Sequence, residues 1–318
     1  MFRVIEGYKG GVKEIDESLV SLLNRCRSVS ISWALRPITI DDFREWFGSS
    51  WYDPREFAIA LLGNRVIGYS WAFGGRVSRI ALCIDPNEPL NISEEVAEML
   101  LAWARYSLES RGIRGIVRVS AWEYQGFMYR LLKRMLYTAI EDHTSTLMKY
   151  VGPISQITIP KGYRIRLATF DDVPGIVNVF NKAFSIYEWF HPWNVDDAMK
   201  HYKRRKPILY VAIDSNGEIV GYVHVELFKA IDNEVTGVLD TVAVDPKHQR
   251  KGLGKALVTI ATKELIKRGA KRIYLDSIKG LENYYSKLGY KEYQKWIALR
   301  TTISQLPQKP LIQYHKMT

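Results

Sequence analysis

The feature that most constrains this chain is a repeated order of short segments in its two halves. Three segments of the first half have a counterpart 153, 160 and 157 positions further on. The pairs are NRVIGY at 64–69 with GEIVGY at 217–222, ALCIDP at 81–86 with TVAVDP at 241–246, and RGIRGI at 111–116 with RGAKRI at 268–273. One match could arise by chance, but three matches in one order and at nearly one spacing indicate an internal duplication.

The duplication predicts two domains of related fold, which suits 318 residues. Strand and helix patterns alternate in each half, as is typical of an α/β protein. In the second half, strands are expected near 208–213, 219–228, 237–244 and 272–276, with a helix over 254–268. The expected organisation is a first domain over 1–151, a proline-bearing linker over 152–161, a second domain over 162–302 and a tail over 303–318.

The positive charge is concentrated in the second half. Residues 1–150 carry 19 Lys and Arg against 18 Asp and Glu, whereas residues 151–318 carry 26 against 16. A basic half is typical of proteins that bind nucleic acid or a phosphorylated small molecule. The basic run KHYKRRK at 200–206 lies beside aromatic residues and could bind nucleic acid, but such a run is more commonly the solvated end of a helix.

Composition excludes several classes of protein. No apolar run approaches the roughly 20 residues that cross a bilayer. The N-terminus, MFRVIEGYKGG, does not have the pattern of a signal peptide, so a cytoplasmic location without membrane contact is expected. Cys26 and Cys83 are 57 positions apart, with no histidine at ligand spacing. We therefore expect two buried free thiols, no disulfide scaffold and no metal site.

The segment most informative about chemistry is VAVDPKHQRKGLGKAL at 242–257. It predicts a strand, a loop with two glycines and the start of a helix. Gly252 and Gly254 let backbone N–H groups approach a ligand closely, and a helix N-terminus attracts anions. Cations beside them are Arg250, Lys251 and Lys255. The segment predicts a phosphate site that is neither a Walker A loop nor a dinucleotide fingerprint.

This loop resembles motif A of the GNAT superfamily of N-acetyltransferases, which is written Gln/Arg-x-x-Gly-x-Gly/Ala. The match here is Gln249-x-x-Gly252-x-Gly254. A second segment, NYYSKLGY at 283–290, resembles the family's downstream motif, Asn…Tyr-x-Lys-x-Gly-Phe. The two motifs make residues 162–300 similar to the family. The resemblance implies two tandem GNAT-like domains, each a mixed, mostly antiparallel sheet flanked by helices, with acetyl-CoA as co-substrate.

The resemblance also implies how acetyl-CoA is held. In the family, the loop amides bind the pyrophosphate, and the strand before the loop splays from its neighbour and binds the pantetheine arm. The implied contacts are Val242, Ala243, Val244, Gln249, Arg250, Lys251, Gly252, Leu253, Gly254, Lys255, Asn283 and Tyr285. For the three strand residues only the backbone is expected to act, with the Val242 N–H polarising the thioester carbonyl.

Tyr285 matches a family tyrosine near the CoA sulfur and is implied as the general acid to the leaving thiolate. The general base stays open. Asp240 is favoured because it precedes Val244 by four residues and is expected on the same strand face. Glu226 on the preceding strand is the competitor, and a water chain to bulk is a third route. The position that the family uses more often is Val238 here, which cannot act.

The acceptor is expected beside FSIYEWFHPW at 184–193, because in this fold the segment after the first helix lines the substrate side. The candidate contacts are Phe184, Tyr187, Glu188, Trp189 and His191. Aromatic rings with a carboxylate would clamp a cationic amine. The alternative interpretation of this segment is a hydrophobic lid or interdomain packing.

The first half keeps the framework but not the loop. Residues 87–95, NEPLNISEE, contain no glycine, and their glutamates place negative charge where a pyrophosphate would lie. Ser93, followed by Glu94 and Glu95, is expected to cap a helix. This half therefore resembles a degenerate GNAT domain that binds no acetyl-CoA, a layout similar to that of mycothiol synthase-like tandem proteins.

The function implied is acetyl transfer from acetyl-CoA to a primary amine by direct attack in a ternary complex, through the second domain. The acceptor would be a small molecule or a peptide amine, and the protein a monomer or dimer. The alternative is a non-catalytic tandem module that binds CoA or nucleic acid as a regulator.

Overall fold

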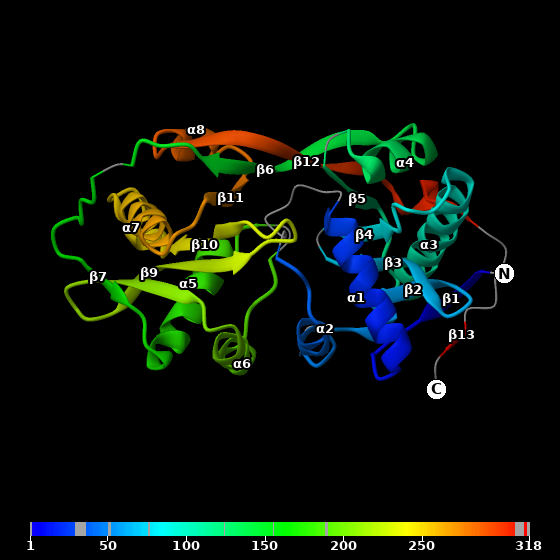
Figure 1. Ribbon diagram of the computed structural model, residues 1–318, viewed down its shortest axis with the longest axis horizontal. Helices are drawn as coiled ribbons and strands as arrows, with labels where there is room; N and C mark the ends of the chain where they lie inside the picture. The colour runs from blue at the N-terminus through cyan, green and yellow to red at the C-terminus, as the bar shows by residue number, and fades with distance from the viewer. Residues whose placement is uncertain are drawn as a thin grey trace. The chain divides into compact units, whose positions relative to one another are not determined.

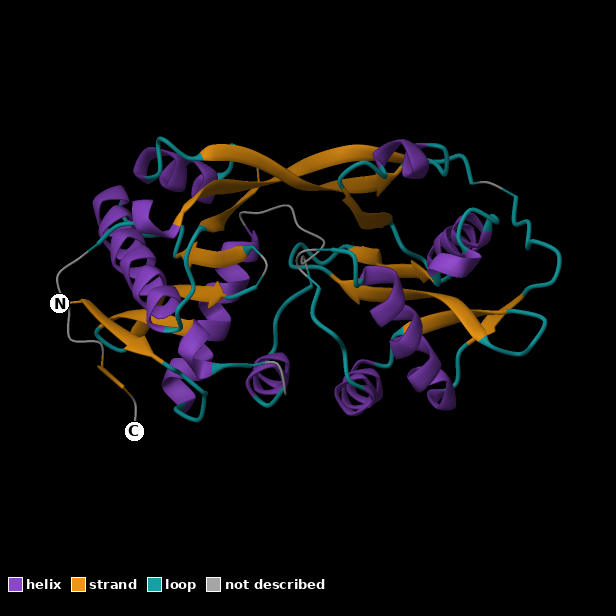
Figure 2. Ribbon diagram, turned by 180° about the vertical axis from the view of Figure 1, so that it is seen from behind, coloured by secondary structure: helices purple, strands orange, loops and turns teal. Residues whose placement is uncertain are grey.

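The structure, a computed structural model, describes residues 2–28, 36–49, 52–75, 77–123, 125–154, 156–187, 190–308 and 315–316. The chain forms two compact units, one of residues 1–144 with 294–318 and one of residues 145–293. Both units combine a sheet with helices on its two faces, as the secondary-structure colours of Figure 2 show. The α/β architecture expected from the sequence is therefore confirmed.

The elements of the first half recur in the same order in the second. The first half contains β1 (Phe2–Glu6), α1 (Lys13–Ser28), α2 (Ile40–Phe47), β2 (Phe57–Leu62), β3 (Arg65–Phe73), β4 (Ser78–Ile84), α3 (Leu90–Ser110), β5 (Ile116–Glu123), α4 (Phe127–Met135) and β6 (Ile140–Tyr150). The second contains β7 (Arg164–Leu167), α5 (Val173–Phe184), α6 (Val195–Arg205), β8 (Ile208–Ile213), β9 (Ile219–Lys229), β10 (Val235–Val244), α7 (Leu253–Lys267), β11 (Arg272–Ile278), α8 (Glu282–Ser286) and β12 (Tyr290–Thr302). A short strand, β13 (His315–Lys316), follows and pairs with β1.

The last strand of each half completes the sheet of the other unit. Residues 145–149 of β6 pair antiparallel with β11, and residues 296–302 of β12 pair antiparallel with β5. The compact units therefore do not coincide with the contiguous ranges expected from the sequence. Periodicity indicates that a segment is a strand, but the choice of pairing partner depends on tertiary structure.

In the second unit the sheet order is β6-β11-β10-β9-β8-β7, and only β10 and β11 are parallel. Helix α7 covers one face, where its Leu257, Val258 and Leu265 pack with Val244 of β10. Helices α5 and α6 cover the opposite face, where Tyr202 packs with residues of α5 and β8–β10. Figure 1 shows the sheet between these two layers of helices.

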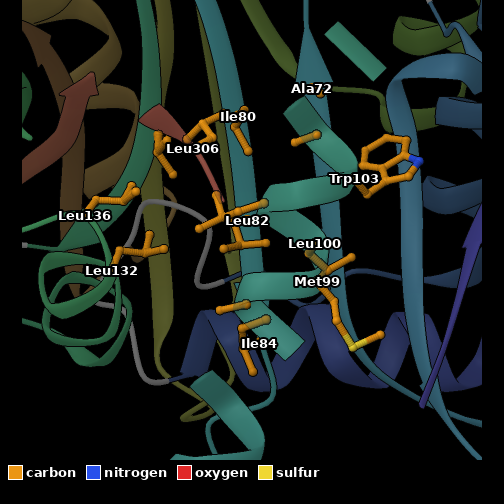
Figure 3. Packing of buried hydrophobic residues seen from close by; sticks show 14 of the residues in the cluster. Ala72, Ile80, Leu82, Ile84, Met99, Leu100, Trp103, Leu132, Leu136 and Leu306 are labelled. Atoms are coloured by element: carbon orange, nitrogen blue, oxygen red, sulfur yellow. The ribbon is translucent and has the colours of Figure 1, made fainter. Parts of the chain in front are cut away.

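In the first unit the sheet order is β13-β1-β2-β3-β4-β5-β12. Its largest core lies between the sheet and helices α3 and α4. Figure 3 shows Leu100 and Trp103 of α3 facing Ile80 and Leu82 of β4, all at most 1% exposed. Burial of this kind contributes about 1.5–3 kcal/mol per large apolar side chain. The opposite face is covered by α1 and α2.

The same helix-start signal occurs after the first strand of the second unit and before α2 in the first. Thr169 and Asp172 form a capping box, and Arg166 pairs with the Asp172 carboxylate at 2.6 and 2.9 Å. In the first unit Thr39 and Asp42 form the same box, and Arg36 contacts Asp42 at 3.1 Å. Both boxes satisfy orphan backbone donors. They do not occupy equivalent positions, because α2 corresponds to α6, whose N-cap is Asn194.

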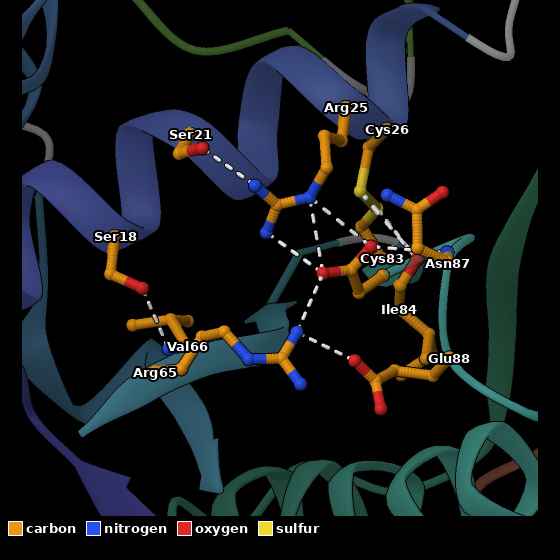
Figure 4. A network of polar contacts seen from close by, with 11 residues as sticks. Ser18, Ser21, Arg25, Cys26, Arg65, Val66, Cys83, Ile84, Asn87 and Glu88 are labelled. Carbon is orange, nitrogen blue, oxygen red and sulfur yellow. Dashed lines mark hydrogen bonds and ion pairs between the residues drawn. A yellow bond between two sulfur atoms is a disulfide. The ribbon is translucent and has the colours of Figure 1, made fainter. Parts of the chain in front are cut away.

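The two cysteines are buried, as expected, but they form a disulfide rather than remaining free thiols. Cys26 on α1 and Cys83 on β4 have Cα atoms 6.5 Å apart, within the range that a disulfide spans. Figure 4 shows the bridge where α1 crosses the strand. The expectation of free thiols was wrong because it rested on separation in sequence, whereas the packing of α1 on β4 decides the spacing in space.

Candidate active site

Strands β10 and β11 part halfway along the sheet. They pair in parallel from Thr236 and Arg272 to Leu239 and Leu275, and no further. Beyond that point β10 stays paired with β9 as far as Val244, while β11 pairs with β6. The splay that the resemblance implies is therefore present, and the β11-facing edge of residues 240–244 has lost its strand partner.

The ladder decides which backbone groups of β10 face this open edge. The Asp245 N–H donates to the Val220 oxygen of β9 at 2.8 Å. Because hydrogen-bonding sides alternate along an antiparallel strand, the groups of Ala243 also face β9, whereas those of Val242 and Val244 face the open edge. The side chain of Gln249 donates to the Val244 oxygen at 3.0 Å, which ties the following loop to the end of the strand.

The loop ends in a helix start that carries no side-chain cap. Gly252 is the N-cap of α7, has a φ of +90° and makes no cap hydrogen bond. Arg250 also has a left-handed backbone, with a φ of +59°. The first N–H groups of a helix have no partner within the helix, so α7 presents donors and its positive dipole end at this point. Such a cradle suits the pyrophosphate of acetyl-CoA. Glycine is required at residue 252 because an L side chain would be strained at this φ.

The charges around the loop suit an anion. Arg250, Lys251 and Lys255 are exposed, and none of them makes an ion pair with a described residue. The nearest carboxylate in sequence, Asp245, is already engaged by Lys182 at 3.1 Å and by the Lys247 N–H at 3.0 Å. The lysine contact and the backbone donor contribute to a lowered Asp245 pKa, although burial opposes them.

The downstream motif brings two tyrosines of α8 to this region in different ways. Tyr285 is 9% exposed and packs in the core under α7. Tyr284 is 37% exposed, and its hydroxyl lies about 3.0 Å from where a Cβ on Gly254 would be. Leu253 is buried in the core, so only its backbone can serve a ligand, and Asn283 is exposed. The position of Tyr284 over the helix start was not foreseen from the sequence.

The hydroxyl of Tyr285 remains protonated at any working pH. Burial is the main cause that raises its pKa well above the usual range, with Tyr284, Tyr187 and Asp276 adding to it. A thiol has an ordinary pKa of about 8.5, so complete transfer of the phenol proton to a thiolate is uphill. Tyr285 is therefore suited to donating a hydrogen bond to negative charge as it develops, rather than to releasing a free proton readily.

The favoured base, Asp240, lies on the face opposite to the one expected. A bulge between Leu239 and Thr241 shifts the register of β10 against β9. Val244 packs toward α7, whereas the Asp240 carboxylate contacts His224 on the α6 side. The four-residue spacing argument was wrong because a bulge adds one residue and turns the side chain across the sheet.

Asp240 is one arm of a carboxylate–imidazole–carboxylate array. His224 Nδ1 lies 3.2 Å from Asp240 Oδ2, and His224 Nε2 lies 3.6 Å from Glu226 Oε1. The imidazole is 4% exposed, the Glu226 side chain 19% and the Asp240 side chain 35%. Thr241 Oγ1 also donates to Asp240 Oδ2 at 2.9 Å. The sequence indicated that the histidine and glutamate share a face, but not that the histidine joins both carboxylates.

The array holds a proton on the imidazole. Burial would lower the pKa of His224, but the two carboxylates outweigh it and raise that pKa to about 9. Burial likewise opposes ionisation of Asp240, and the histidine lowers the Asp240 pKa to about 2. His224 and Asp240 therefore titrate as a coupled pair, with the imidazole protonated and the Asp240 carboxylate ionised at neutral pH.

A third carboxylate, Asp276, follows Leu275, the last residue of β11 that pairs with β10, and was missed in the sequence. The protein around it raises its pKa to about 6, although the Ser145 hydroxyl donates to it at 3.1 Å. Its electrostatic effect on Tyr285 places it near that ring. Each of these carboxylates comes from a different position along the sheet, so no local motif marks them.

The segment expected to receive the acceptor is anchored to α5. Asn181 Nδ2 donates to the Trp193 oxygen at 2.9 Å, and the Trp193 N–H donates to Asn181 Oδ1 at 2.8 Å. Phe184 packs on Phe180 and on Tyr187, with ring centroids 4.9 and 6.0 Å apart. His191 is exposed, and the predicted contacts Glu188 and Trp189 lie outside the described residues.

The basic run at 200–206 forms the last turn of α6 and its C-cap, Lys206, with basic residues in the last turn, where a helix favours cations. Its Tyr202 points inward and packs against His224.

The equivalent loop of the first unit is built differently. Helix α3 begins at Leu90 with Pro89 as N-cap, so Ser93 lies inside the first turn and is not the cap expected from the sequence. Asp85 accepts from Arg25, with Nη2–Oδ2 at 2.8 Å, and from Arg65 at 3.2 Å (Figure 4). Arg65 also pairs with Glu88 at 2.6 Å. The carboxylates of this loop are thus bound by cations from α1 and β3 of the same unit.

Residues 174–290 match the Acetyltransferase (GNAT) family, a range that includes the glycine loop, α7 and α8. The second unit therefore contains a GNAT acetyltransferase domain. An uncharacterized N-acetyltransferase of Methanocaldococcus jannaschii is 26% identical over 140 residues, which make up 42% of this chain. The match spans 62% of that relative's length.

Solved structures show the same tandem layout. A GCN5-related N-acetyltransferase from Sphaerobacter thermophilus aligns over 98% of both chains with a TM-score of 0.61 at 14% identity. A tandem GNAT protein from the clavulanic acid biosynthesis pathway aligns over 95% of this chain and 98% of its own, with a TM-score of 0.65 at 14% identity. The tandem GNAT fold expected from the sequence is confirmed. Within the described part of the chain, no helix has the length and apolar character needed to cross a membrane.

Proposed function

We propose that the chain is an acetyl-CoA-dependent N-acetyltransferase that acts through its second unit and acetylates a primary amine by direct attack in a ternary complex. One observation carries the proposal: a helix start left uncapped at Gly252 follows a strand whose edge is open beyond Leu239. The match of residues 174–290 to the GNAT family supports the proposal. The first unit, which lacks the glycine loop, is proposed to bind no acetyl-CoA.

The donor would be held mainly by backbone. The N–H groups at the start of α7 suit the pyrophosphate, and Arg250, Lys251 and Lys255 add charge around it. The open-edge groups of Val242 and Val244 suit the amides of the pantetheine arm, with the Val242 N–H proposed to polarise the thioester carbonyl. When bound, acetyl-CoA supplies the activated acetyl group.

Proton handling is assigned to the array and to Tyr285. We assign Asp240 the proton of the attacking amine, since it is the most exposed arm of the array on the acceptor face. Glu226 is the second carboxylate and lies deeper. As the nitrogen–carbon bond forms and the carbon–sulfur bond breaks, Tyr285 donates a hydrogen bond to the leaving sulfur.

The acceptor would be a small molecule or a peptide amine, met by Phe184, Tyr187 and His191. The electrostatic effect of Tyr187 on Tyr285 supports placing this segment beside the reaction centre. The carboxylates nearby favour an acceptor that carries positive charge.

The proposal is tested by following release of the CoA thiol from acetyl-CoA across a panel of primary amines. Turnover that depends on an amine and saturates with it supports the transferase. Tight acetyl-CoA binding without turnover for any amine would contradict it and favour a regulatory module that binds CoA. The Asp240→Asn variant should bind acetyl-CoA normally but lose roughly 10²-fold or more in turnover.

A cytoplasmic location remains a proposal, and the Cys26–Cys83 disulfide opposes it. Most cytosols keep thiols reduced, apart from those of hyperthermophilic organisms. Acid-quenched cell lysates, alkylated before and after reduction, would show the state of the pair. A fully reduced pair in the cell would agree with a reducing cytoplasm.

A further inference from the structure

The array around His224 does more than place a carboxylate at the reaction face. A buried imidazole with a carboxylate at each nitrogen is costly to build, because a charge taken out of water must be compensated nearby. Only 4% of the His224 side chain is exposed, so the ring does not itself present to an acceptor. Its contribution must pass through Asp240 or Glu226.

The bulge explains why the histidine is needed. It turns Asp240 to the α6 face of the sheet, where the carboxylate reaches His224. His224 is the cross-strand partner of Thr241, the residue that follows Asp240. Thr241 Oγ1 and His224 Nδ1 both approach Asp240 Oδ2, at 2.9 and 3.2 Å, which leaves Oδ1 without a hydrogen-bond partner among the described residues. One carboxylate oxygen is therefore fixed from two sides while the other is available to the acceptor.

The surroundings of the ring contain few competing charges. From α6, Tyr202 lies 5.6 Å and His201 6.2 Å from the His224 ring centroid, both edge-on. From β8 the cross-strand neighbour is the apolar Leu209. On its own strand, Glu226 and the buried Tyr222 lie two residues away on either side. Only the two carboxylates can hold a positive ring in place.

We propose that His224 is the positioning residue of the base: a protonated imidazole that fixes Asp240 with one oxygen turned to the acceptor, keeps it ionised and ties it to Glu226. This inference rests on the proposed transferase function. It assigns His224 no contact with either substrate. During attack the amine proton passes to Asp240 and from there to water, while the imidazole keeps its own proton.

The comparison between the units supports a role in chemistry rather than in folding. Gly68 pairs with Ile84 in the first unit as Gly221 pairs with Val244 in the second. Counting from these pairs, the counterparts of His224 and Glu226 are Trp71 and Phe73, whereas Asp240 lies at the bulge of β10, and β4 pairs with β3 without such a bulge. The same fold forms with aromatic residues at both positions and without the bulge, so the fold does not require the array.

The direct test is a pH titration of the imidazole by NMR, with the signal of His224 identified as the one lost in His224→Asn. The expected midpoint is about 9, well above the ordinary value near 6.5. Asp240→Asn should lower it more than Glu226→Gln, because the Asp240 contact is shorter. A midpoint at or below the ordinary value would overturn the inference, whether or not the protein acetylates anything.

The kinetic test separates charge from hydrogen bonding. His224→Asn keeps an N–H donor but removes the charge, and turnover should fall roughly 10-fold. His224→Phe removes both the donor and the charge, and turnover should fall roughly 100-fold. Acetyl-CoA affinity should be unchanged in both variants. Losing the charge raises the pKa of Asp240, so the rate of each variant relative to wild type should fall further as pH is lowered from 7 to 5. This ratio cancels ionisation of the acceptor itself.

Two results would contradict the positioning role. One is His224→Phe with wild-type turnover and an unchanged pH profile. The other is an equal loss of turnover in the Asn and Phe variants, with a rate relative to wild type that does not vary with pH. That result would indicate that the ring only packs. Failure of the wild type to turn over any amine would instead count against the transferase function, and the NMR titration would still decide the state of His224.

Discussion

The loop after β4 and the loop after β10 begin from the same strand end and an aspartate, yet they handle charge in opposite ways. In the first unit, Asp85 binds Arg25 and Arg65, and Glu88 binds the same Nη1 of Arg65 that contacts Asp85. In the second unit Asp245 binds Lys182, while the cations further along the loop have no carboxylate partner among the described residues. The carboxylates of the first loop are neutralised by arginines of α1 and β3, and the second loop is left open to an anion.

This contrast corrects the reason for expecting no acetyl-CoA in the first unit. Repulsion by the loop glutamates is reduced, because Glu88 pairs with Arg65 and Glu94 with Arg134 at 3.1 Å. What the first loop lacks is a glycine at the helix start and cations that are not already engaged. A GNAT site therefore depends on a few loop residues rather than on the framework.

The two units also differ on the sheet face that carries the His224 array in the second unit. Where the second unit has His224 and Glu226, the first has Trp71 and Phe73, which line an apolar cavity of about 250 Å³ together with Phe57 and Tyr69. An apolar cavity of this kind offers no proton acceptor. The two units thus share an order of strands and helices, but at these positions one carries an imidazole and a carboxylate and the other carries aromatic rings.

The largest expected effect is on acetyl-CoA binding. Gly252→Val should lower affinity by at least about 100-fold, because a φ of +90° disfavours a side chain and the loop amides would move. Gly217→Val is the matched control, since its φ is +84° and a Cβ there would meet no atom within 4 Å. Thermal unfolding should show a similar loss of stability in both variants. Calorimetry should show loss of acetyl-CoA binding in Gly252→Val only.

Next in size is the effect of the tyrosine hydroxyls, which separate chemistry from binding. Tyr285→Phe should lower kcat roughly 10- to 1000-fold with little change in acetyl-CoA affinity. Tyr284→Phe should change acetyl-CoA affinity more than kcat, because its hydroxyl lies over the start of α7. Steady-state kinetics with the same amine would compare them, and a Tyr285→Phe enzyme with wild-type kcat would show that this ring only packs.

A smaller effect is expected from single loop cations. Lys255→Ala should weaken acetyl-CoA binding roughly 3- to 10-fold and reduce its salt dependence, since exposed charges are screened at high ionic strength. Arg65→Ala, the matched change in the first unit, should leave binding unchanged because that side chain is held by Asp85 and Glu88. Titrations at two salt concentrations check both, and equal losses would remove the distinction between the loops.

The smallest expected effect is that of losing either capping box. Asp172→Asn and Asp42→Asn should each cost about 1–2 kcal/mol in the stability of their own unit, because each removes one capping box and its arginine contact. The Asp172 pKa is lowered to about 2, chiefly by Arg166. Its contribution is therefore present above pH 3.8 and is lost as pH falls toward 2. Thermal unfolding from pH 6 to pH 2 should show the Asp172→Asn variant converging on wild type.

Local pattern in the sequence predicted the parts of the site that are local. The glycine loop, the helix after it and the strand before it are contiguous, so residues 242–257 were enough to place them. The capping box at Thr169 was visible for the same reason.

The parts that depend on register were not predictable. The face of Asp240 is decided by a bulge against β9, and the disulfide by the crossing of α1 over β4. The partner strands of β6 and β12 are likewise chosen by tertiary packing. The role of Tyr284 depends on α8 lying beside the start of α7. Each of these involves residues far apart in sequence, for which periodicity carries no information.

The most direct test of the asymmetry between the units is a calorimetric titration of the intact chain with acetyl-CoA. One site per chain is expected, and it should disappear in Gly252→Val but persist in Arg65→Ala. Two equivalent sites per chain would contradict the account, as would one site that survives Gly252→Val, because either result would place acetyl-CoA on the loop after β4.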